Sequence, residues 1–310
     1  MPETRPAPGL EHSREKKPGA GIHLLLLVSV AIWGSTFVAM KHLLGHVTAF
    51  ELVGLRFAIG LPVLGAVVLA RRIPLEFDRR DLRPLALGAV ILLVHFVLQP
   101  LALSLEKTTA TNTGWIISFS PLWIALLSWL VLRERLGARQ IAGIATATAG
   151  ILVLVSRGSL SGLSWLESAG DWIIFFTAFT WALYTIATRD LARRRGALAV
   201  TLVVFVPTCI VCLAATAFRW DGSRLGSLPV SAVLALLYLG ILGTLAQWFW
   251  QLGVARLGAS RAGLYVYLEP LATTVLAVPL LSEPFGVPTA VGGLLVLGGV
   301  FWAQSSQPVG

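Results

Sequence analysis

Long apolar segments fill most of this chain. Hydrophobic residues make up 56% of its 310 residues and charged residues only 13%, whereas a soluble domain carries about 25% charged residues. A helix needs about 20 apolar residues to cross a bilayer. Ten segments meet this condition: 22–43, 48–70, 83–104, 108–132, 138–156, 170–191, 197–218, 229–251, 258–281 and 285–304. The sequence therefore predicts an all-α integral membrane protein with ten transmembrane helices, short connections and no room for a soluble catalytic domain.

The second half of the chain repeats the first. Residues that are informative in so apolar a chain recur at nearly constant offsets: with a shift of 149 residues, Pro121 falls on Pro270, Glu134 on Glu283 and Gly143 on Gly292, and with a shift of 148, Trp33 falls on Trp181. Each half contains five predicted spans, and an odd number of spans turns the second copy over in the bilayer. Inverted repeats are typical of secondary transporters. We therefore predict two inverted five-helix repeats, 22–156 and 170–304, around a central cavity.

The charged residues predict how the chain lies in the membrane. Residues 1–21 are rich in proline, glycine and charge, and are predicted to form a disordered, basic cytoplasmic tail. The first span is too long for a signal peptide and lacks a small-residue cleavage site. Although the net charge is +9, the arginines and lysines concentrate in alternate loops, which is the positive-inside pattern. This predicts a multi-pass protein of the cytoplasmic (inner) membrane with both termini inside, and argues against nucleic-acid binding.

Neither a cofactor nor a metal is expected. Cys209 and Cys212 form a C-x-x-C pair within the seventh span, but a zinc site needs about four ligands and no histidine or second cysteine pair accompanies them. Both thiols are expected to pack as small apolar groups.

Several stretches resemble one known family. They are A-I-W-G-S-T-F-V-A-M-K (31–41), S-P-L-W-I-A-L-L-S-W-L-V-L-R-E-R-L (120–136), W-A-L-Y-T-I-A-T-R (181–189) and L-E-P-L-A-T-T-V-L-A-V-P-L-L-S-E-P (268–284). In this order they resemble the EamA family of the drug/metabolite transporter superfamily, and Arg56 in the second span also fits that pattern. The resemblance implies a ten-helix transporter whose central cavity is lined by helices 1, 3, 4, 6, 8 and 9. It does not identify the substrate.

Glu269 is the sharpest candidate for a functional residue. It lies about halfway along the ninth span, where a carboxylate is costly unless it faces a wet cavity, is paired or is protonated. The first repeat has Ser120 at the equivalent place, so the two halves differ chemically at the midplane. Glu269 is expected either to take up a proton or oppose a substrate ammonium, or to bond a neighbouring helix beside Pro270.

Polar and aromatic residues deep in other spans complete the candidate binding set. His95 and Gln99 are spaced i, i+4 and share one helix face. Aromatic faces can bind apolar groups or cations. The substrate-binding or coupling candidates are Trp33, His95, Gln99, Trp115, Trp181, Tyr184, Gln247, Tyr265 and Glu269. For each of them the alternative is ordinary packing between helices.

A second set is expected to be structural or to act in gating: Arg56, Pro121, Pro270, Glu134 and Glu283. Arg56 is expected to extend outward or to pair with Glu51, and a structural or gating role is favoured over direct binding. The two glutamates suit the N-terminus of the following helix, and the two prolines suit bends. Glycines of the fifth and tenth spans are expected to let these helices approach neighbours or a second protomer.

These observations favour a secondary transporter of small metabolites and not an enzyme. Export of amino acids or related compounds by alternating access is the leading hypothesis, and its direction and substrate rest on the resemblance. Proton coupling is possible, and the chain is expected to be a monomer or a homodimer. Uptake, efflux of organic cations or multiple drugs, and a channel or receptor stay as alternatives. An intramembrane enzyme would need a converging catalytic set, and none is visible in the spans.

Overall fold

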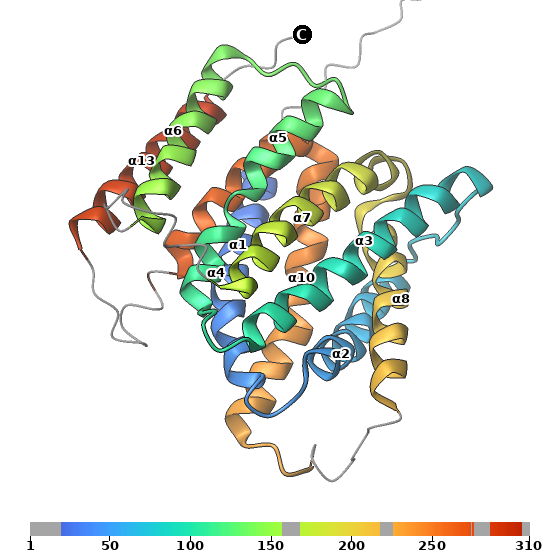
Figure 1. Ribbon diagram of the computed structural model, residues 1–310. Helices are drawn as coiled ribbons and strands as arrows, with labels where there is room; N and C mark the ends of the chain where they lie inside the picture. Colours follow the sequence, from blue (N-terminus) through green and yellow to red (C-terminus); the bar gives the residue numbers. More distant parts are fainter. Residues whose placement is uncertain (1–19, 157–167, 218–225, 274, 276–285, 306–310) are drawn as a thin grey trace, which may run out of the picture.

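The protein is a bundle of helices (Figure 1). The computed structural model describes residues 20–156, 168–217, 226–273, 275 and 286–305. Residues 1–19 of the predicted tail and Glu283 lie outside them, whereas Ala20 and Gly21, which were assigned to the tail, belong to the first helix. The helices of the first half are α1 (Ala20–Leu43), α2 (Ala49–Ala70), α3 (Arg79–Ser104), α4 (Ala110–Ile117), α5 (Ser120–Leu130) and α6 (Ala138–Val155). Those of the second half are α7 (Ala169–Arg195), α8 (Ala197–Ala217), α10 (Val230–Leu257), α11 (Ala259–Gly263), the 3₁₀ helix η1 (Leu264–Leu268) and α13 (Val287–Gln304).

Within the described residues, seven helical segments are long and apolar enough to cross a bilayer, and two shorter apolar helices lie at Ala138–Val153 and Ala290–Gln304. The chain is therefore a multi-pass membrane protein. The expected fourth span is divided into α4 and α5. The expected ninth span, 258–281, is described as α11, η1 and a helical stretch that continues to residue 273, with most of the remainder outside the described residues. The full ten-span topology stays a prediction.

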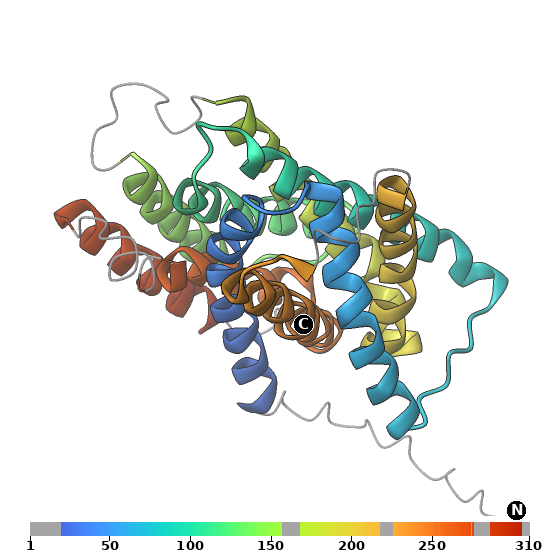
Figure 2. The same ribbon diagram turned by 90° about the horizontal axis from the view of Figure 1, so that it is seen from below.

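The helices pack in pairs that join the two halves. The most extensive contacts are α6 with α13, α1 with α10, α3 with α7, and α2 with α8. Two views show α6 and α13 along one edge of the bundle and α8 toward the opposite edge, with α1, α7 and α10 between them (Figures 1 and 2). If each helix is replaced by its counterpart in the other half, the α1–α10 pair becomes the α3–α7 pair, and the α2–α8 and α6–α13 pairs each stay the same. A two-fold relation requires this pattern, but the pattern does not fix the direction of the axis, so the inversion stays a prediction.

Glycines explain how α6 and α13 approach so closely. A Cβ atom added to Gly143 would lie 2.5 Å from the carbonyl oxygen of Gly299, and one added to Gly150 would lie 2.7 Å from the carbonyl oxygen of Gly292. Backbone thus meets backbone at both points, as at other small-residue helix contacts in membranes. These glycines were expected to let helices approach either neighbours in the same chain or a second protomer. The structure shows the first of these, a contact between α6 and α13 of the same chain.

Capping boxes fix the beginnings of three helices. At α2, Thr48 and Glu51 bond each other's backbone amides, and the same reciprocal arrangement begins α3 and α7. Such boxes satisfy amides that have no partner within the helix. Glu51 is used in this way, and no ion pair joins it to Arg56 among the described residues.

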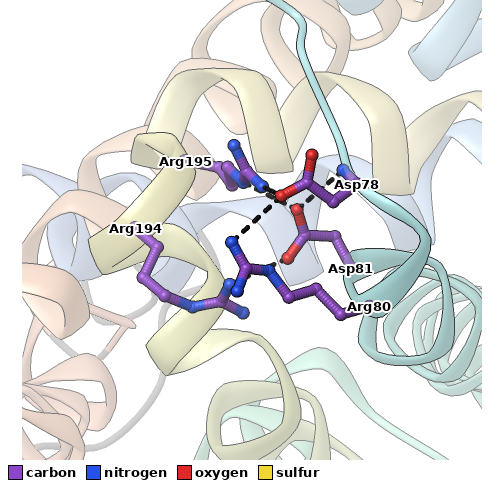
Figure 3. A network of polar contacts seen from close by, with 5 residues as sticks. All are labelled: Asp78, Arg80, Asp81, Arg194 and Arg195. Atoms are coloured by element: carbon purple, nitrogen blue, oxygen red, sulfur yellow. Dashed lines mark hydrogen bonds and ion pairs between the residues drawn. The ribbon is translucent and has the colours of Figure 1, made fainter.

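A charged network ties the beginning of α3 to the end of α7 (Figure 3). The Asp81 side chain is fully buried and pairs with Arg194 at 2.9 Å and with Arg195 at 2.6 Å. Asp78 pairs with Arg195 and, at 3.1 Å, with Arg80. The network therefore fixes the relative position of one helix from each half.

Both halves contain a helix break beside the repeated proline. In the first half α4 ends at Ile117, and Pro121 lies in the first turn of α5. In the second half the tighter η1 helix precedes Glu269 and Pro270. Proline lacks the amide hydrogen that a continuous helix would use and disfavours helical geometry before it. Residues of both stretches, Ile117 in the first half and Val266 and Glu269 in the second, lie at the candidate site.

Candidate functional site

A pocket lies between the two halves near the helix breaks. It is lined by Trp33, Thr36, Phe37, Met40, Arg56, His95, Phe96, Gln99 and Ile117 of the first half, and by Trp181, Gln247, Val266 and Glu269 of the second. Its volume of about 40 Å³ suffices for a few water molecules. A larger ligand therefore requires the lining side chains to move.

Three tryptophans form the aromatic side of the site. The Trp33 ring meets the edge of Trp181 at 5.2 Å between centroids, and Trp250 lies 5.5 Å from Trp33 and 5.7 Å from Trp181. Trp33 and Trp181 occupy equivalent positions in the repeat and both line the pocket. The indole nitrogens of Trp33 and Trp250 are buried without a hydrogen-bond partner in the described part of the chain. The cluster offers apolar faces together with an unused donor at the pocket wall.

Glu269 also lines the pocket. It is 3% exposed, and its side chain takes part in no hydrogen bond or ion pair within the described ranges. Its backbone carbonyl accepts a bond from Thr273, whose hydroxyl also reaches the carbonyl of Gly34. The backbone after Glu269 is thus fixed against α1, while the carboxyl group remains available to the pocket.

His95 is held by α7. Its Nδ1 lies 3.1 Å from the carbonyl oxygen of Thr177 and 3.0 Å from the hydroxyl of Thr180. A carbonyl can only accept, so we assign the ring proton to Nδ1, which leaves Nε2 as an acceptor in the neutral ring. The ring also packs 5.2 Å from Trp181. His95 therefore joins α3 to α7 at the pocket wall, and its role in substrate binding or coupling stays a prediction.

Two glutamines add neutral polar groups. Gln99 lines the pocket one turn from His95, as the i, i+4 spacing predicts, and Gln247 lines it from α10. The Oε1 atom of Gln247 is buried without a donor among the described residues. It can accept a hydrogen bond from a bound ligand.

Arg56 occupies a place that the sequence prediction missed. It is 3% exposed and lines the pocket, so it neither extends outward nor pairs with Glu51. Its guanidinium lies over the rings of Phe57 and Phe96, with Cζ at 5.2 and 4.9 Å from their centroids. The described lining of the pocket therefore includes one arginine and one glutamate, and no ion pair joins these two side chains at 4.0 Å or less.

Three aromatic candidates lie outside the pocket lining. Trp115 is buried, and Tyr184 is fully buried and packs on Trp181 at 5.4 Å. Tyr265 bonds the ring of His23 and, at 3.2 Å, the side chain of Gln304. Tyr265 thus joins α1, η1 and α13.

Glu134 contacts a helix other than the one expected. Its Oε2 accepts a 2.7 Å bond from the Ser260 hydroxyl and a 3.4 Å bond from the Ser260 amide at the beginning of α11, whereas the sequence favoured the helix that directly follows Glu134. Carboxylates suit such positions because the first amides of a helix lack partners. The residue joins the two halves.

Four residues on one face of α1 line the pocket, and their helical spacing is a sequence signal that could have identified more of the pocket residues. Trp33, Thr36, Phe37 and Met40 are spaced i, i+3, i+4 and i+7, which places them on one helix face, and all four line the pocket. Phe96, Ile117 and Val266 lack such a signal, because in so apolar a chain their residue types do not distinguish a pocket from a packed core.

A multi-pass helical bundle with a pocket between its two halves fits the class of membrane transporters with repeated halves. Comparison with known proteins supports this class and specifies the family. The model of the EamA-like transporter family matches residues 20–156 and again residues 168–304. The chain belongs to the EamA-like transporter family, within the drug/metabolite transporter superfamily.

Relatives agree with that assignment, and a solved structure shares the fold. The chain is similar to an uncharacterized transporter of Archaeoglobus fulgidus, with 30% identity over 92% of this chain and 98% of the relative. A probable amino-acid metabolite efflux pump of Salmonella typhimurium is 26% identical over 89% of this chain and 92% of the pump. A probable terminal-alkyne amino-acid exporter of Streptantibioticus cattleyicolor is 29% identical over 89% and 90%. A crystal structure with 23% identity covers 92% of this chain and 97% of its own, with a TM-score of 0.74, and shows the same fold.

Proposed function

We propose that this protein exports amino acids or related compounds across the cytoplasmic membrane by alternating access. The observation that carries the proposal is the pocket, because the two halves of the chain build it jointly and place buried charged and polar groups between them. Carriers with repeated halves bind their substrate at such an interface and rock the halves around it. Two relatives named as a probable amino-acid exporter or efflux pump support the substrate class.

Proton coupling through Glu269 is part of this proposal. A carboxyl group in the pocket without a fixed partner can alternate between a protonated and an ionised state. His95 is held by Thr177 and Thr180, so it is less free to change its partners. We therefore assign the coupling proton to Glu269.

Orientation and repeat geometry complete the proposal. The excess of arginine and lysine in alternate loops favours both termini in the cytoplasm. In this orientation the end of the bundle that carries Glu134 and Arg189 faces the cytoplasm. The paired contacts between halves support two five-helix repeats, 22–156 and 170–304. That the two-fold axis lies in the membrane plane follows from the odd number of spans expected in each repeat.

Counterflow into liposomes tests the transport function. Purified protein would be reconstituted and screened with amino acids, nucleosides and organic cations, each with and without a pH gradient. We expect saturable counterflow with amino acids. Preference for organic cations would favour drug efflux, a conductive flux would indicate a channel, and the absence of any flux would contradict the proposal.

A further inference from the structure

Arg56 is a buried cation for which the described part of the chain provides no anion. Its side chain forms no ion pair and no hydrogen bond among those residues, and its Nε is buried without an acceptor. A buried charge is costly unless it is paired. The two phenylalanine rings beneath the guanidinium offset part of this cost, because ring faces attract cations. A site that buries a positive charge without a counterion is suited to bind an anionic group of a ligand.

The surroundings of Arg56 are shaped around its guanidinium. A Cβ atom on Gly243 of α10 would lie 3.0 Å from Nη2, so the absence of a side chain there leaves room for the group. Close contact between α2 and α10 fixes the backbone nearby, since a Cβ on Gly240 would lie 3.0 Å from the carbonyl oxygen of Arg56. Phe57 and Phe96 cover the guanidinium with aromatic surface. This environment holds the cation in place at the pocket wall.

The opposite charge lines the same pocket. Glu269 is as deeply buried as Arg56, and its carboxyl group has no partner in the described part of the chain. The two side chains come from different halves, and they do not form an ion pair. A ligand that carries both an anionic and a cationic group would satisfy both side chains at once, whereas an organic cation would leave Arg56 without a counterion.

We infer that Arg56 binds the carboxylate of a zwitterionic amino acid and that Glu269 binds its ammonium group. Arginine is suited to this role because its planar donors match a carboxylate in a bidentate fashion. Beside the neutral polar groups of the pocket, Trp33, Phe37 and Met40 form an apolar stretch of the wall, and we expect an apolar or aromatic side chain of the substrate to pack against it. This assignment rests on the proposed transport of amino acids and gives Arg56 a direct binding role.

Binding to purified protein tests the assignment separately from transport. The readout is ligand-induced thermal stabilisation in detergent, which follows ligand affinity. The probes are L-leucine and L-phenylalanine, their amides, and the acids 4-methylpentanoate and 3-phenylpropanoate. An amide keeps the shape of the amino acid but lacks its negative charge, and the two acids lack the ammonium group.

For the wild-type protein we expect each amide to bind at least about 10-fold more weakly than its amino acid, since charged hydrogen-bond partners in buried sites are costly to remove. In Arg56→Gln, affinity for the amino acid should fall about 10- to 100-fold, while affinity for the amide should change about threefold or less. In Glu269→Gln the preference for the amino acid over the ammonium-free acid should be lost. Arg56→Lys should keep the preference for the amino acid over the amide.

A matched control, Arg71, lies directly after the end of the same helix. Arg71 also places its guanidinium over an aromatic ring, that of Trp248 at 5.7 Å, but it is exposed and does not line the pocket. Arg71→Gln should leave all affinities unchanged. Equal binding of amino acid and amide to the wild-type protein would overturn the assignment, even if Arg56→Gln failed to fold. Equal losses of both ligands in Arg56→Gln would mark Arg56 as structural.

Liposome counterflow separates this inference from the transport proposal. Amino-acid counterflow by the wild-type protein, combined with no discrimination between acid and amide, would refute only the role of Arg56. Counterflow restricted to polar amino acids would refute the apolar side-chain class. If no amino acid supports counterflow, both proposals fail.

Discussion

Arg189 of α7 and Glu134, which follows α5, form an ion pair with 3.0 Å between Nη2 and Oε1. The other oxygen of the same carboxyl group accepts the Ser260 hydroxyl at the beginning of α11. Glu134 belongs to the first half of the chain, whereas both of its partners belong to the second. One carboxylate therefore joins the halves at one end of the bundle, and a carrier that opens at that end has to break this contact.

Loss of this contact should loosen that end of the bundle. Glu134→Gln removes the charge that holds Arg189 and weakens the bond from Ser260, at a cost of roughly 1–3 kcal/mol. We expect faster amide hydrogen exchange in α11 when the protein is embedded in lipid nanodiscs. Arg80→Gln is a suitable control because Arg80 makes only an exposed pair with Asp78. Unchanged exchange in α11 would show that Glu134 does not hold this end closed.

The network at Asp81 should contribute to stability more than the exposed pair beside it. Asp81→Asn removes the charge from a fully buried side chain that two arginines contact, and thereby leaves both without their shared anion. We expect a drop of several degrees in the thermal unfolding temperature in detergent. Asp78→Asn alters a side chain that is 53% exposed, so it should change the unfolding temperature less. An equal effect of the two substitutions would contradict this ranking.

Neighbouring glycines on α13 provide a direct test of helix packing. A Cβ atom on Gly299 would lie 2.5 Å from the backbone nitrogen of Ala147, whereas one on Gly298 would meet nothing within 4 Å. Gly299→Ala should therefore destabilise the protein by roughly 1–3 kcal/mol, because backbone has to shift. Gly298→Ala should be neutral or slightly stabilising, since alanine favours helix more than glycine does. Thermal unfolding of both variants in one detergent gives the comparison, and similar unfolding temperatures would argue against close α6–α13 packing.

Local signals in the sequence predicted much of the fold but only part of the site. The repeated Pro121 and Pro270 predicted bends, and helix breaks lie beside both. Trp33 and Trp181 were expected in the cavity, and both line it. These successes depend on residue types that stand out against an apolar background and on their order along the chain.

The remaining site residues depend on which helix faces which. Arg56 was expected to extend outward or to pair with Glu51, because long charged side chains within a span commonly reach toward its end. Its room is instead set in part by Gly243, which lies far along the chain. Tyr265 was expected in the pocket, yet its hydroxyl bonds His23 and Gln304. Helices that are apolar on every side carry no periodic signal for their facing partner. Only the packed arrangement distinguishes these positions.

Membrane topology is open to a separate test. We expect both termini in the cytoplasm, because arginine and lysine concentrate in alternate loops. A reporter that is active only in the cytoplasm should therefore be active when it is fused after Gly310. A second reporter, active only outside the cytoplasm, provides the control and should be inactive at the same position. A C-terminus outside the cytoplasm would exclude the combination of ten spans with an N-terminus inside.

Glu269 should couple transport to protons. Its buried carboxyl group lines the pocket and has no fixed partner in the described part of the chain. Ser120 stands at the equivalent place in the first repeat, which indicates that the fold does not require a charge there. Glu269→Gln preserves the size of the side chain and most of its hydrogen-bonding capacity but cannot gain or lose a proton. We expect normal abundance and folding, together with loss of net transport or of its dependence on pH. Gln247→Glu provides a reciprocal variant that places a carboxyl group on α10 in the lining of the same pocket, and it should not restore coupling in the Glu269→Gln background. The measurement is the initial rate of uptake into liposomes between about pH 5.5 and 8, a range in which buried carboxyl groups can titrate. A Glu269→Gln protein that retains both the rate and the pH dependence of the wild-type protein would show that Glu269 serves only to hold helices together.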